Sequence, residues 1–364
     1  MKITKPVMLL DLGKCENNIG KMVEKAKEKN VTFRPHFKTH QSIQLGEIFK
    51  RFGIDKITVS SVEMAQYFAN AGWNDITIAF PFNILEINSI KDLSDKINLN
   101  ILISSQESAL KLIEVTSKPL NYFVEIDTGY HRSGISAKDI KQVRKTVQIL
   151  SQHNFKGFLT HSGNTYKSDS TQKILDIHHD ALEKMKKLKI EFIEQYPDLI
   201  SSTGDTPSCT LAEEFDDIDE IRPGNFIFFD LMQHHLGVCN LSEIAVCVAC
   251  PVVDINRERN QIVIYGGGIH LSKEFILQNG NKIFGQVVKL SESVWKFPTE
   301  NSYLNSLSQE HGIIQASENL INEVSIGDIL GIIPVHSCMT ANLMGSYRTL
   351  NNQIFYHFSN NKRN

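Results

Sequence analysis

The sequence predicts an α/β protein, in which a closed (β/α)8 TIM barrel is followed by an all-β domain. Over roughly the first 240 residues, short apolar runs alternate with amphipathic stretches, and about eight such pairs fit there. No glycine-rich dinucleotide fingerprint follows the first apolar run, which disfavours an open doubly wound sheet. Beyond about residue 240, strand-like runs are separated by turns with little helix, as in an all-β module.

The elements of roughly the first 200 residues follow from two periodicities. In the stretch Lys14–Asn30, apolar residues recur at helical spacing at Ile19, Met22, Val23 and Ala26. The other expected helices are Ser42–Phe52, Val62–Ala71, Leu85–Leu93, Ser105–Thr116, Ala137–His153 and Ser170–Lys187. The expected strands are Pro6–Leu12, Val31–Phe33, Ile57–Ser60, Ile76–Phe80, Leu99–Ile103, Asn121–Asp127, Phe155–His161 and Leu199–Ser202.

The later strands are expected at Ile244–Val253, Gln261–Tyr265, Lys282–Leu290, Gly312–Gln315 and Ile329–Ile333. The predicted domains are therefore a barrel of residues 10–240 and a β domain of residues 241–364, with the last residues, 360–364, frayed.

Composition excludes several classes of protein. The 364 residues carry a formal net charge of -3, so no basic excess indicates nucleic-acid binding. No apolar run approaches the roughly 20 residues that cross a bilayer, and the N-terminus lacks signal-peptide features. The six cysteines form no dense framework, which favours reduced thiols and a cytoplasmic location. Cys247 and Cys250 have CxxC spacing, but they lie in an apolar run and are interpreted as buried strand residues.

The central motif is Arg34-Pro-His-Phe-Lys-Thr-His40, which follows a short apolar run. If the segment is extended, His36, Lys38 and His40 lie on one side of it. A lysine whose pKa is lowered by cationic or apolar neighbours becomes a nucleophilic amine that can form a Schiff base. An exposed lysine at a strand end is the alternative interpretation.

Polar residues recur where other barrel strands end, and such ends form the active face of a TIM barrel. Arg132 follows one strand, and His161 ends another. The loop Ser202-Thr-Gly-Asp-Thr-Pro-Ser208 and Pro223-Gly224-Asn225 could turn backbone N–H groups toward one phosphate. Lysine and a phosphate cradle are what pyridoxal 5'-phosphate (PLP) requires. His161 could stack on its ring, or be a core histidine, and Tyr166 or Arg222 could meet the ring nitrogen.

A second group of residues lies in the predicted β domain. His336 and Cys338 are two residues apart, hence on one face of an expected strand. An imidazole with a thiolate suits zinc, and two ligands leave open positions for water and substrate. A packed cysteine beside a polar histidine is the alternative.

Together these motifs, in this order, resemble those of D-threonine aldolases and eukaryotic-type D-serine dehydratases. These are fold-type III, alanine-racemase-like PLP enzymes, and the likeness covers nearly the whole chain. It implies a homodimer whose β domain is completed by the N-terminal strand, residues 1–9. It also implies that Lys38 binds PLP covalently, that Arg132 lies near its phenolic oxygen and that His161 packs on its ring. The implied phosphate residues are Gly204, Asp205, Thr206, Gly224 and Asn225, with Thr203 as a further cofactor-binding residue, and the implied metal ligands are His336 and Cys338.

Within that family the aldolases tend to carry His-x-Asp at the metal site and the dehydratase type His-x-Cys. Cys338 therefore favours zinc, with manganese as the alternative, and a D-serine dehydratase-like lyase that forms keto acid and ammonia. The alternatives are a D-threonine aldolase, an amino-acid racemase and a non-catalytic PLP carrier. The expected partner is a small D-amino acid, with neither nucleic acid nor membrane.

Overall fold

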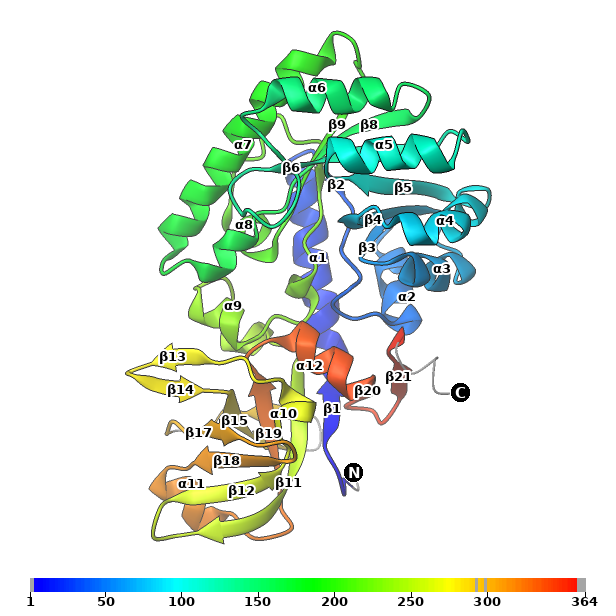
Figure 1. Cartoon of the computed structure of the whole chain (residues 1–364). Coiled ribbons are helices and arrows are strands. Elements are labelled where there is room, and N and C mark those ends of the chain that lie inside the picture. Colours follow the sequence, from blue (N-terminus) through cyan, green and yellow to red (C-terminus); the bar gives the residue numbers. More distant parts are fainter. Residues whose placement is uncertain (1–2, 292–293, 298–299, 359–364) are drawn as a thin grey trace. The chain divides into compact units, whose positions relative to one another are not determined.

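The computed structural model describes residues 3–291, 294–297 and 300–358. Residue contacts divide these into two compact units (Figure 1). The barrel unit consists of Gly20–Lys38 and Gly46–Gly224, and the β unit consists of the remaining described residues. The predicted frayed end, 360–364, lies outside the described residues.

Eight parallel strands of the barrel unit form the path of one sheet, and a short ninth strand, β7 (Ile135–Ser136), pairs with β6 off that path. Their order is β2-β10-β9-β8-β6-β5-β4-β3. The sheet closes where the chain continues beyond β2, because His36 bridges Thr58 of β3 in parallel register. The backbone N–H of Phe37 donates to the Thr58 carbonyl at 2.8 Å. The strands are β2 (Thr32–Phe33), β3 (Lys56–Val59), β4 (Asp75–Pro81), β5 (Asn98–Ile103), β6 (Asn121–Asp127), β8 (Asn154–Leu159), β9 (Ile200–Thr203) and β10 (Glu220–Ile221).

The strands are buried on both faces, as parallel strands covered by helices are. In β6 the five residues from Tyr122 to Ile126 are all buried. Gly157 in β8 has φ +135°, and a Cβ there would lie 2.0 Å from the carbonyl oxygen of Ile200 in β9. Only glycine therefore lets β8 and β9 approach at this point. The predicted closed barrel is confirmed.

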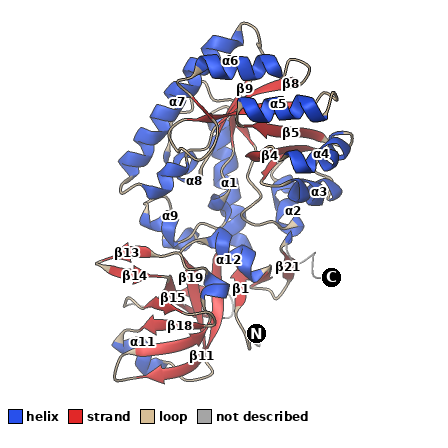
Figure 2. Cartoon of the chain, in the orientation of Figure 1, coloured by secondary structure: helices blue, strands red, loops and turns tan. Residues whose placement is uncertain are grey.

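Helices cover the outside of these strands (Figure 2). Polar side chains start several of them, because a side-chain oxygen can accept a free N–H of the first turn. Ser61, Ser105, Asp139 and Ser170 each do so. The helices of at least six residues up to Gly224 are α1 (Leu12–Glu28) and α2 (Ile43–Arg51), which both begin in the β unit, then α3 (Val62–Asn70), α4 (Ile87–Ser94), α5 (Gln106–Val115), α6 (Ile140–Ile149), α7 (Thr171–Ile193) and α8 (Thr206–Leu211).

The β unit is built on one mostly antiparallel sheet of order β12-β18-β17-β15-β19-β11-β1-β20-β21. The N-terminal strand β1 pairs antiparallel with β11 and parallel with β20, so strands from early and late in the sequence are neighbours in one sheet. Cys247 and Cys250 are buried in β11, as predicted. The strands of the sheet are β1 (Val7–Leu10), β11 (Val246–Asn256), β12 (Gln261–Tyr265), β15 (Gly285–Leu290), β16 (Trp295–Lys296), β17 (Tyr303–Leu307), β18 (His311–Gln315), β19 (Ile329–Pro334), β20 (Ser346–Thr349) and β21 (Ile354–Tyr356).

Shorter elements connect the strands of the β unit. The hairpin β13 (Ile276–Gln278) and β14 (Asn281–Ile283) forms its own two-stranded sheet. The helices that matter below are α9 (Leu231–His235), α10 (Gly268–Leu271) and α12 (Ser337–Met344).

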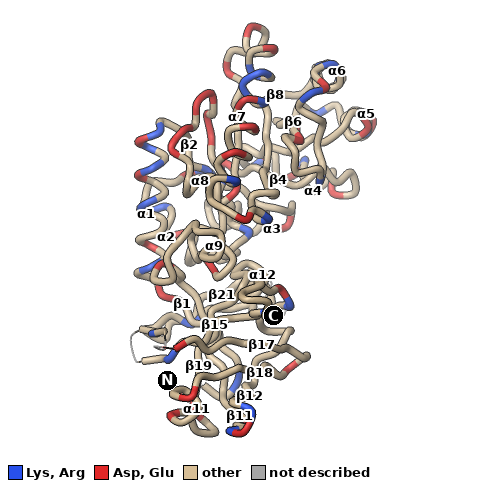
Figure 3. Tube along the Cα trace, turned by 90° about the vertical axis from the view of Figure 1, so that its left-hand side faces the viewer, with Lys and Arg blue, Asp and Glu red and all other residues tan. Residues whose placement is uncertain are grey.

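Charged residues of both signs are interspersed along the elements, as α1 shows (Figure 3). Among the described residues, the helices are all too short or too polar to cross a membrane.

Candidate active site

In the barrel unit, the predicted residues follow the carboxyl ends of strands. Lys38 comes after β2, Arg132 after β6 and His161 after β8. Gly204 comes directly after β9, and Arg222 after β10. Because the carboxyl ends of parallel strands meet at one rim of a barrel, the structure brings these residues to the same rim.

The chain around Lys38 is held by its neighbours on both sides. The backbone N–H of His36 donates to the Pro223 carbonyl at 2.9 Å, which ties this segment to the loop after β10. Phe37 packs among three aromatic rings, with centroid distances of 4.9 Å to Phe49, 5.0 Å to Phe68 and 5.1 Å to Trp73. Lys38 itself is exposed between buried residues. Its backbone is thus anchored, while the residue itself is exposed.

The expectation that His36, Lys38 and His40 share one side of an extended segment is wrong. Residues 37–40 form a turn, so alternation along a strand does not apply to them. His40 is buried, and its Nδ1 accepts the backbone N–H of Ser42 at 3.2 Å.

Two histidines lie near the lysine, and both are neutral at pH 7. Burial lowers the pKa of His36 well below its usual range, and the charges of Lys38 and Arg222 lower it further. Burial likewise lowers the pKa of His161 to about 3, with the Lys38 charge adding to the effect. Nδ1 of His161 donates to the Gly204 carbonyl at 2.5 Å, because a carbonyl can only accept.

Tyr130, which was not among the predicted site residues, packs between Arg132 and His161. The Arg132 guanidinium lies 5.2 Å from the centroid of the Tyr130 ring, and this ring meets His161 edge-on at 5.9 Å. A Cβ on Gly163 would lie 2.5 Å from the Tyr130 ring, so glycine is needed for this packing. Arg132 is exposed and free to meet an anionic oxygen.

The predicted phosphate loop begins at Thr203, the last residue of β9. A Cβ on Gly204 would lie 2.8 Å from backbone atoms of Arg222, so the loops after β9 and β10 touch backbone to backbone. The Asp205 carboxylate caps α8, accepting from Ser208 N at 2.8 Å and from the Thr165 hydroxyl at 3.0 Å. Burial raises the pKa of Asp205 to about 6. The Asp205 side chain therefore holds the loop, and the backbone is what the loop can offer a phosphate.

The two candidates for the ring nitrogen have different surroundings. The Tyr166 hydroxyl accepts the backbone N–H of Thr206 at 3.4 Å, which places it at the phosphate loop. Arg222 is buried, and its Nε donates to Ser202 Oγ at 2.7 Å while Nη2 donates to the Thr160 carbonyl. Burial lowers the pKa of Arg222 to about 10, which leaves it a cation at pH 7.

An exposed lysine beside neutral histidines, an arginine at the rim and backbone-lined loops match the donor set that PLP requires. Gly224 is partly exposed in the loop that Pro223 ties to the lysine segment.

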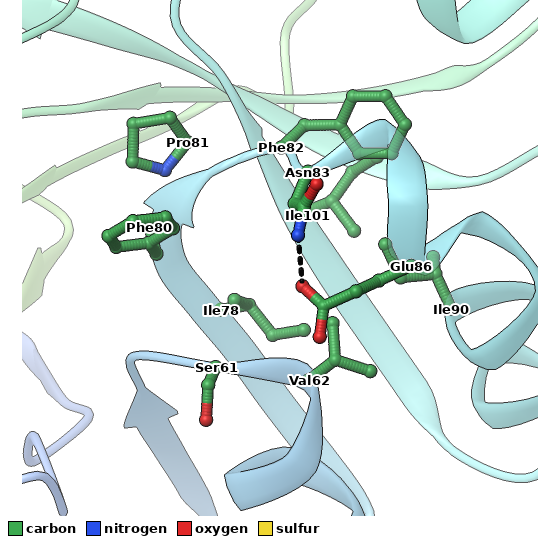
Figure 4. Close-up of a pocket in the computed structure, with 10 residues that line it drawn as sticks. All are labelled: Ser61, Val62, Ile78, Phe80, Pro81, Phe82, Asn83, Glu86, Ile90 and Ile101. Carbon is green, nitrogen blue, oxygen red and sulfur yellow. Dashed lines mark hydrogen bonds between the residues drawn. The ribbon is translucent and has the colours of Figure 1, made fainter.

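A separate small cavity adjoins the end of β4 (Figure 4). It is lined mainly by apolar side chains such as Phe80, Ile90 and Ile101. Its polar feature is the hydrogen bond from Asn83 to Glu86, at 3.0 Å. Its volume of about 20 Å³ has room for one water molecule, and none of the predicted site residues lines it.

In the β unit, His336 and Cys338 do not lie on a strand, which corrects the sequence prediction. β19 ends at Pro334, His336 is the N-cap of α12, and Cys338 lies in its first turn. Their side chains nevertheless interact, because each shifts the pKa of the other. A tight turn, rather than the pleat of a strand, brings the imidazole and the thiol together.

The electrostatics favour the ionised form of Cys338. Burial alone raises the pKa of the Cys338 thiol, but hydrogen bonding and the charge of His336 bring it below its usual value. Burial alone lowers the pKa of His336, but hydrogen bonds to Cys338 and Glu274 raise it above its usual range. A neighbour-stabilised thiolate with an imidazole is a donor pair suited to a divalent metal such as zinc.

Four further residues surround this pair, none of them predicted to contact it. Cys338 Sγ lies 3.3 Å from the Thr39 hydroxyl and 3.4 Å from the Asn225 amide nitrogen. The buried carboxylate of Asp230 accepts from the Ser337 backbone at 2.9 Å and from Asn225 at 2.7 Å. Glu274 Oε2 lies 2.7 Å from Nδ1 of His336. Asn225, which the resemblance assigns to the phosphate, thus holds Cys338 with its amide.

The described residues contain no cluster of three or more His, Cys, Asp or Glu side chains placed to hold a metal ion. His336 and Cys338 fit a metal as two protein ligands, with the remaining positions open to water or substrate.

Comparisons with known proteins match both parts of the chain. The model of the alanine racemase N-terminal domain matches residues 10–231, and a serine dehydratase domain model matches residues 245–350. D-serine dehydratase of Dictyostelium discoideum is 29% identical, over 98% of this chain and 96% of that protein. D-threo-3-hydroxyaspartate dehydratase of Delftia sp. is 25% identical, over 95% of this chain and 93% of that protein.

Solved structures show the same fold. The Delftia sp. HT23 dehydratase superposes with a TM-score of 0.90 at 24% identity, covering 98% of each chain. D-threonine aldolase of Filomicrobium marinum superposes with a TM-score of 0.82 at 18% identity, covering 100% of this chain and 99% of that one.

Proposed function

From the membership of this chain in the alanine racemase N-terminal domain family, we propose that it is a PLP- and metal-dependent lyase acting on a D-β-hydroxy amino acid. The proposed reaction is that of a D-serine dehydratase, which releases a keto acid and ammonia. The observation that carries the proposal is the convergence of His336 and Cys338, because a racemase or a mere carrier has no use for a metal-binding pair.

The barrel residues would hold the cofactor. Lys38 would bind its aldehyde, and the backbone of residues 203–206 with Gly224 would hold its phosphate. His161 would pack on the ring face, and Arg132 would meet the phenolic oxygen. When bound, PLP supplies an electron sink for negative charge at the substrate Cα.

The side chains of this protein would then carry out the proton transfers. The Lys38 amine, flanked by two neutral histidines, would take the proton from the substrate Cα. His161 cannot do so through Nδ1, because that nitrogen donates to the Gly204 carbonyl. The histidines instead keep the surroundings of the amine free of additional positive charge.

The pair His336 and Cys338 would hold the metal, with zinc as the proposed ion and manganese as the alternative. A bound divalent ion supplies a Lewis acid for the β-hydroxyl group. Thr39, which hydrogen-bonds Cys338, is the next residue after Lys38 in the chain. Support also comes from a D-threo-3-hydroxyaspartate dehydratase, of which a cysteine-to-alanine variant was solved in a metal-free form.

Two finer features belong to the same proposal. A homodimer is proposed from the resemblance to alanine-racemase-like enzymes. A cytoplasmic location is proposed because all six cysteines are free.

The test is to incubate the purified protein with D-serine, D-threonine and D-threo-3-hydroxyaspartate, with and without a chelator. Keto acid and ammonia are the expected products, and the chelator is expected to stop their formation. Lys38→Ala is expected to lower turnover by roughly 10²–10⁴-fold and to abolish the cofactor absorption near the visible edge. Lys141→Ala, an exposed lysine on α6, is the control.

An aldolase is the second candidate, favoured by the superposition on D-threonine aldolase over the full chain. The same assay decides, because glycine and an aldehyde would then replace keto acid and ammonia. Turnover that survives chelation would refute the metal part of the proposal. A protein that takes up no PLP would refute all of it.

A further inference from the structure

Glu274 makes a specific contact with the histidine of the metal-binding pair. It lies between α10 and β13, 62 residues before His336 in the chain. Its Oε2 is 2.7 Å from Nδ1 of His336. A carboxylate can only accept here, so the proton of the imidazole lies on Nδ1. Nε2 is then the ring nitrogen left for a metal ion, which would bind there in place of its proton.

This arrangement is the one by which proteins orient histidine ligands. A metal-binding histidine commonly donates its second ring N–H to a carboxylate, which fixes both the tautomer and the ring orientation. His336 needs such a partner because it is an N-cap residue and its own helix makes no side-chain cap hydrogen bond with it. The remaining contacts around the pair act on Cys338 and Ser337: Thr39 and Asn225 lie at the sulfur, and Asp230 holds the Ser337 backbone.

We propose that Glu274 is the positioning residue of His336: it holds the imidazole so that a divalent metal ion binds through Nε2 together with Cys338. The inference rests on the proposed metal pair but adds a residue to it. Glu274 acts through His336 and is not itself a ligand, because Nδ1 of His336 occupies its Oε2 and the described residues form no three-donor cluster.

Glu274 is suited to mutation because little of the fold depends on it. The side chains of His336 and Glu274 are 31% and 45% exposed. Exposed pairs of this kind contribute little to folding stability. Glu310 offers a matched control: it is 43% exposed and lies 4.0 Å from another histidine, His270, of the same unit.

The experiment measures metal binding directly. PLP-loaded protein is stripped of metal with a chelator and titrated with Co²⁺, and the thiolate-to-cobalt charge-transfer band is followed as a difference spectrum. Glu274→Ala is expected to weaken Co²⁺ affinity by about 10–100-fold, the usual effect of losing an outer partner. Glu274→Gln keeps an oxygen acceptor for Nδ1–H and is expected to lose less. Glu310→Ala is expected to bind as the wild type does.

The outcomes separate this inference from the proposed function. If the wild type shows no thiolate-to-cobalt band, the metal pair itself is refuted. If the wild type shows the band and Glu274→Ala binds Co²⁺ equally tightly, only the role of Glu274 is overturned. A change in the cobalt d–d spectrum of Glu274→Ala, signifying the loss of a bound oxygen, would make Glu274 a ligand and would also overturn it. Unchanged circular dichroism of the variants excludes misfolding as the cause.

Discussion

The side-chain amide of Asn225 lies 3.4 Å from the sulfur of Cys338, and the same nitrogen donates to Asp230 at 2.7 Å. A residue that the resemblance places at the cofactor phosphate thus supports the thiol with its side chain. A hydrogen bond to a thiolate stabilises its charge and fixes its direction. Cys338 therefore depends on a residue more than a hundred positions away in the sequence.

Asn225→Ala is expected to lower metal affinity by about 10-fold, because Cys338 loses an N–H donor. PLP affinity is expected to change less, since a phosphate would meet the backbone at this position. Metal titration and PLP titration of the same preparations measure both. Asn281→Ala, an exposed asparagine on β14, is the control. If only PLP affinity falls, Asn225 binds the phosphate of PLP and does not support Cys338.

Cys338→Asp is expected to retain metal binding but to shift its preference. A carboxylate is a harder ligand than a thiolate, so affinity for manganese should rise relative to zinc by roughly tenfold. Competition titrations with the two ions measure the ratio, with Cys338→Ser as the control that removes the thiolate without adding a carboxylate. An unchanged ratio would mean that Cys338 does not contact the metal.

The stability of the protein is expected to depend on pH through Asp205. Burial raises its pKa from 3.8 to about 6, so between these values the folded state binds a proton that the unfolded state has lost. The contribution of Asp205 is present below about pH 4 and is lost as the pH rises through 6. His161 acts in the opposite direction: burial lowers its pKa from 6.5 to about 3, so its contribution is lost as the pH falls below 6.5.

Asp205→Asn keeps an oxygen that can cap α8 but cannot ionise. Its free energy of unfolding, relative to the wild type, is therefore expected to be greater at pH 7 than at pH 4. Urea unfolding at the two pH values measures this, with the exposed Asp216→Asn as the control. Equal differences at both pH values would contradict the raised pKa.

Gly157→Ala is expected to destabilise the barrel by about 3 kcal/mol or more, because the new Cβ would lie 2.0 Å from the Ile200 carbonyl oxygen at a φ of +135°. Gly53→Ala also places a side chain at positive φ, +80°, but with no atom within 4 Å. It should cost only about 1 kcal/mol. Urea midpoints give both values, and similar costs would mean that β8 can move away from β9.

The fold could be predicted because its signals are local. Buried runs such as Tyr122–Ile126 and side-chain caps such as Ser61 and Ser170 specify their own strands and helices. Short strands were harder to predict. The strand β10, Glu220–Ile221, has only two residues, and it is a strand because it pairs with β2 and β9.

The candidate site could be predicted where residues follow strands, as Lys38 and His161 do. It could not be predicted where contacts between residues far apart in the sequence determine the position of a side chain. The turn after His36 directs His40 to Ser42, and the end of β19 at Pro334 puts Cys338 on a helix. Glu274 and Asp230 gave no signal, because an acidic residue in a loop is common and its partner lies far along the chain.

The seam that closes the barrel has a consequence for the lysine. His36 and Phe37, which follow β2, make the last backbone contacts with Thr58 of β3, and Lys38 is the next residue. Its main chain is therefore fixed by the folding of the barrel, independently of any ligand. Cofactor uptake should proceed as simple docking onto a rigid support, and the amide hydrogen of Phe37 should exchange with deuterium as slowly before loading as after it.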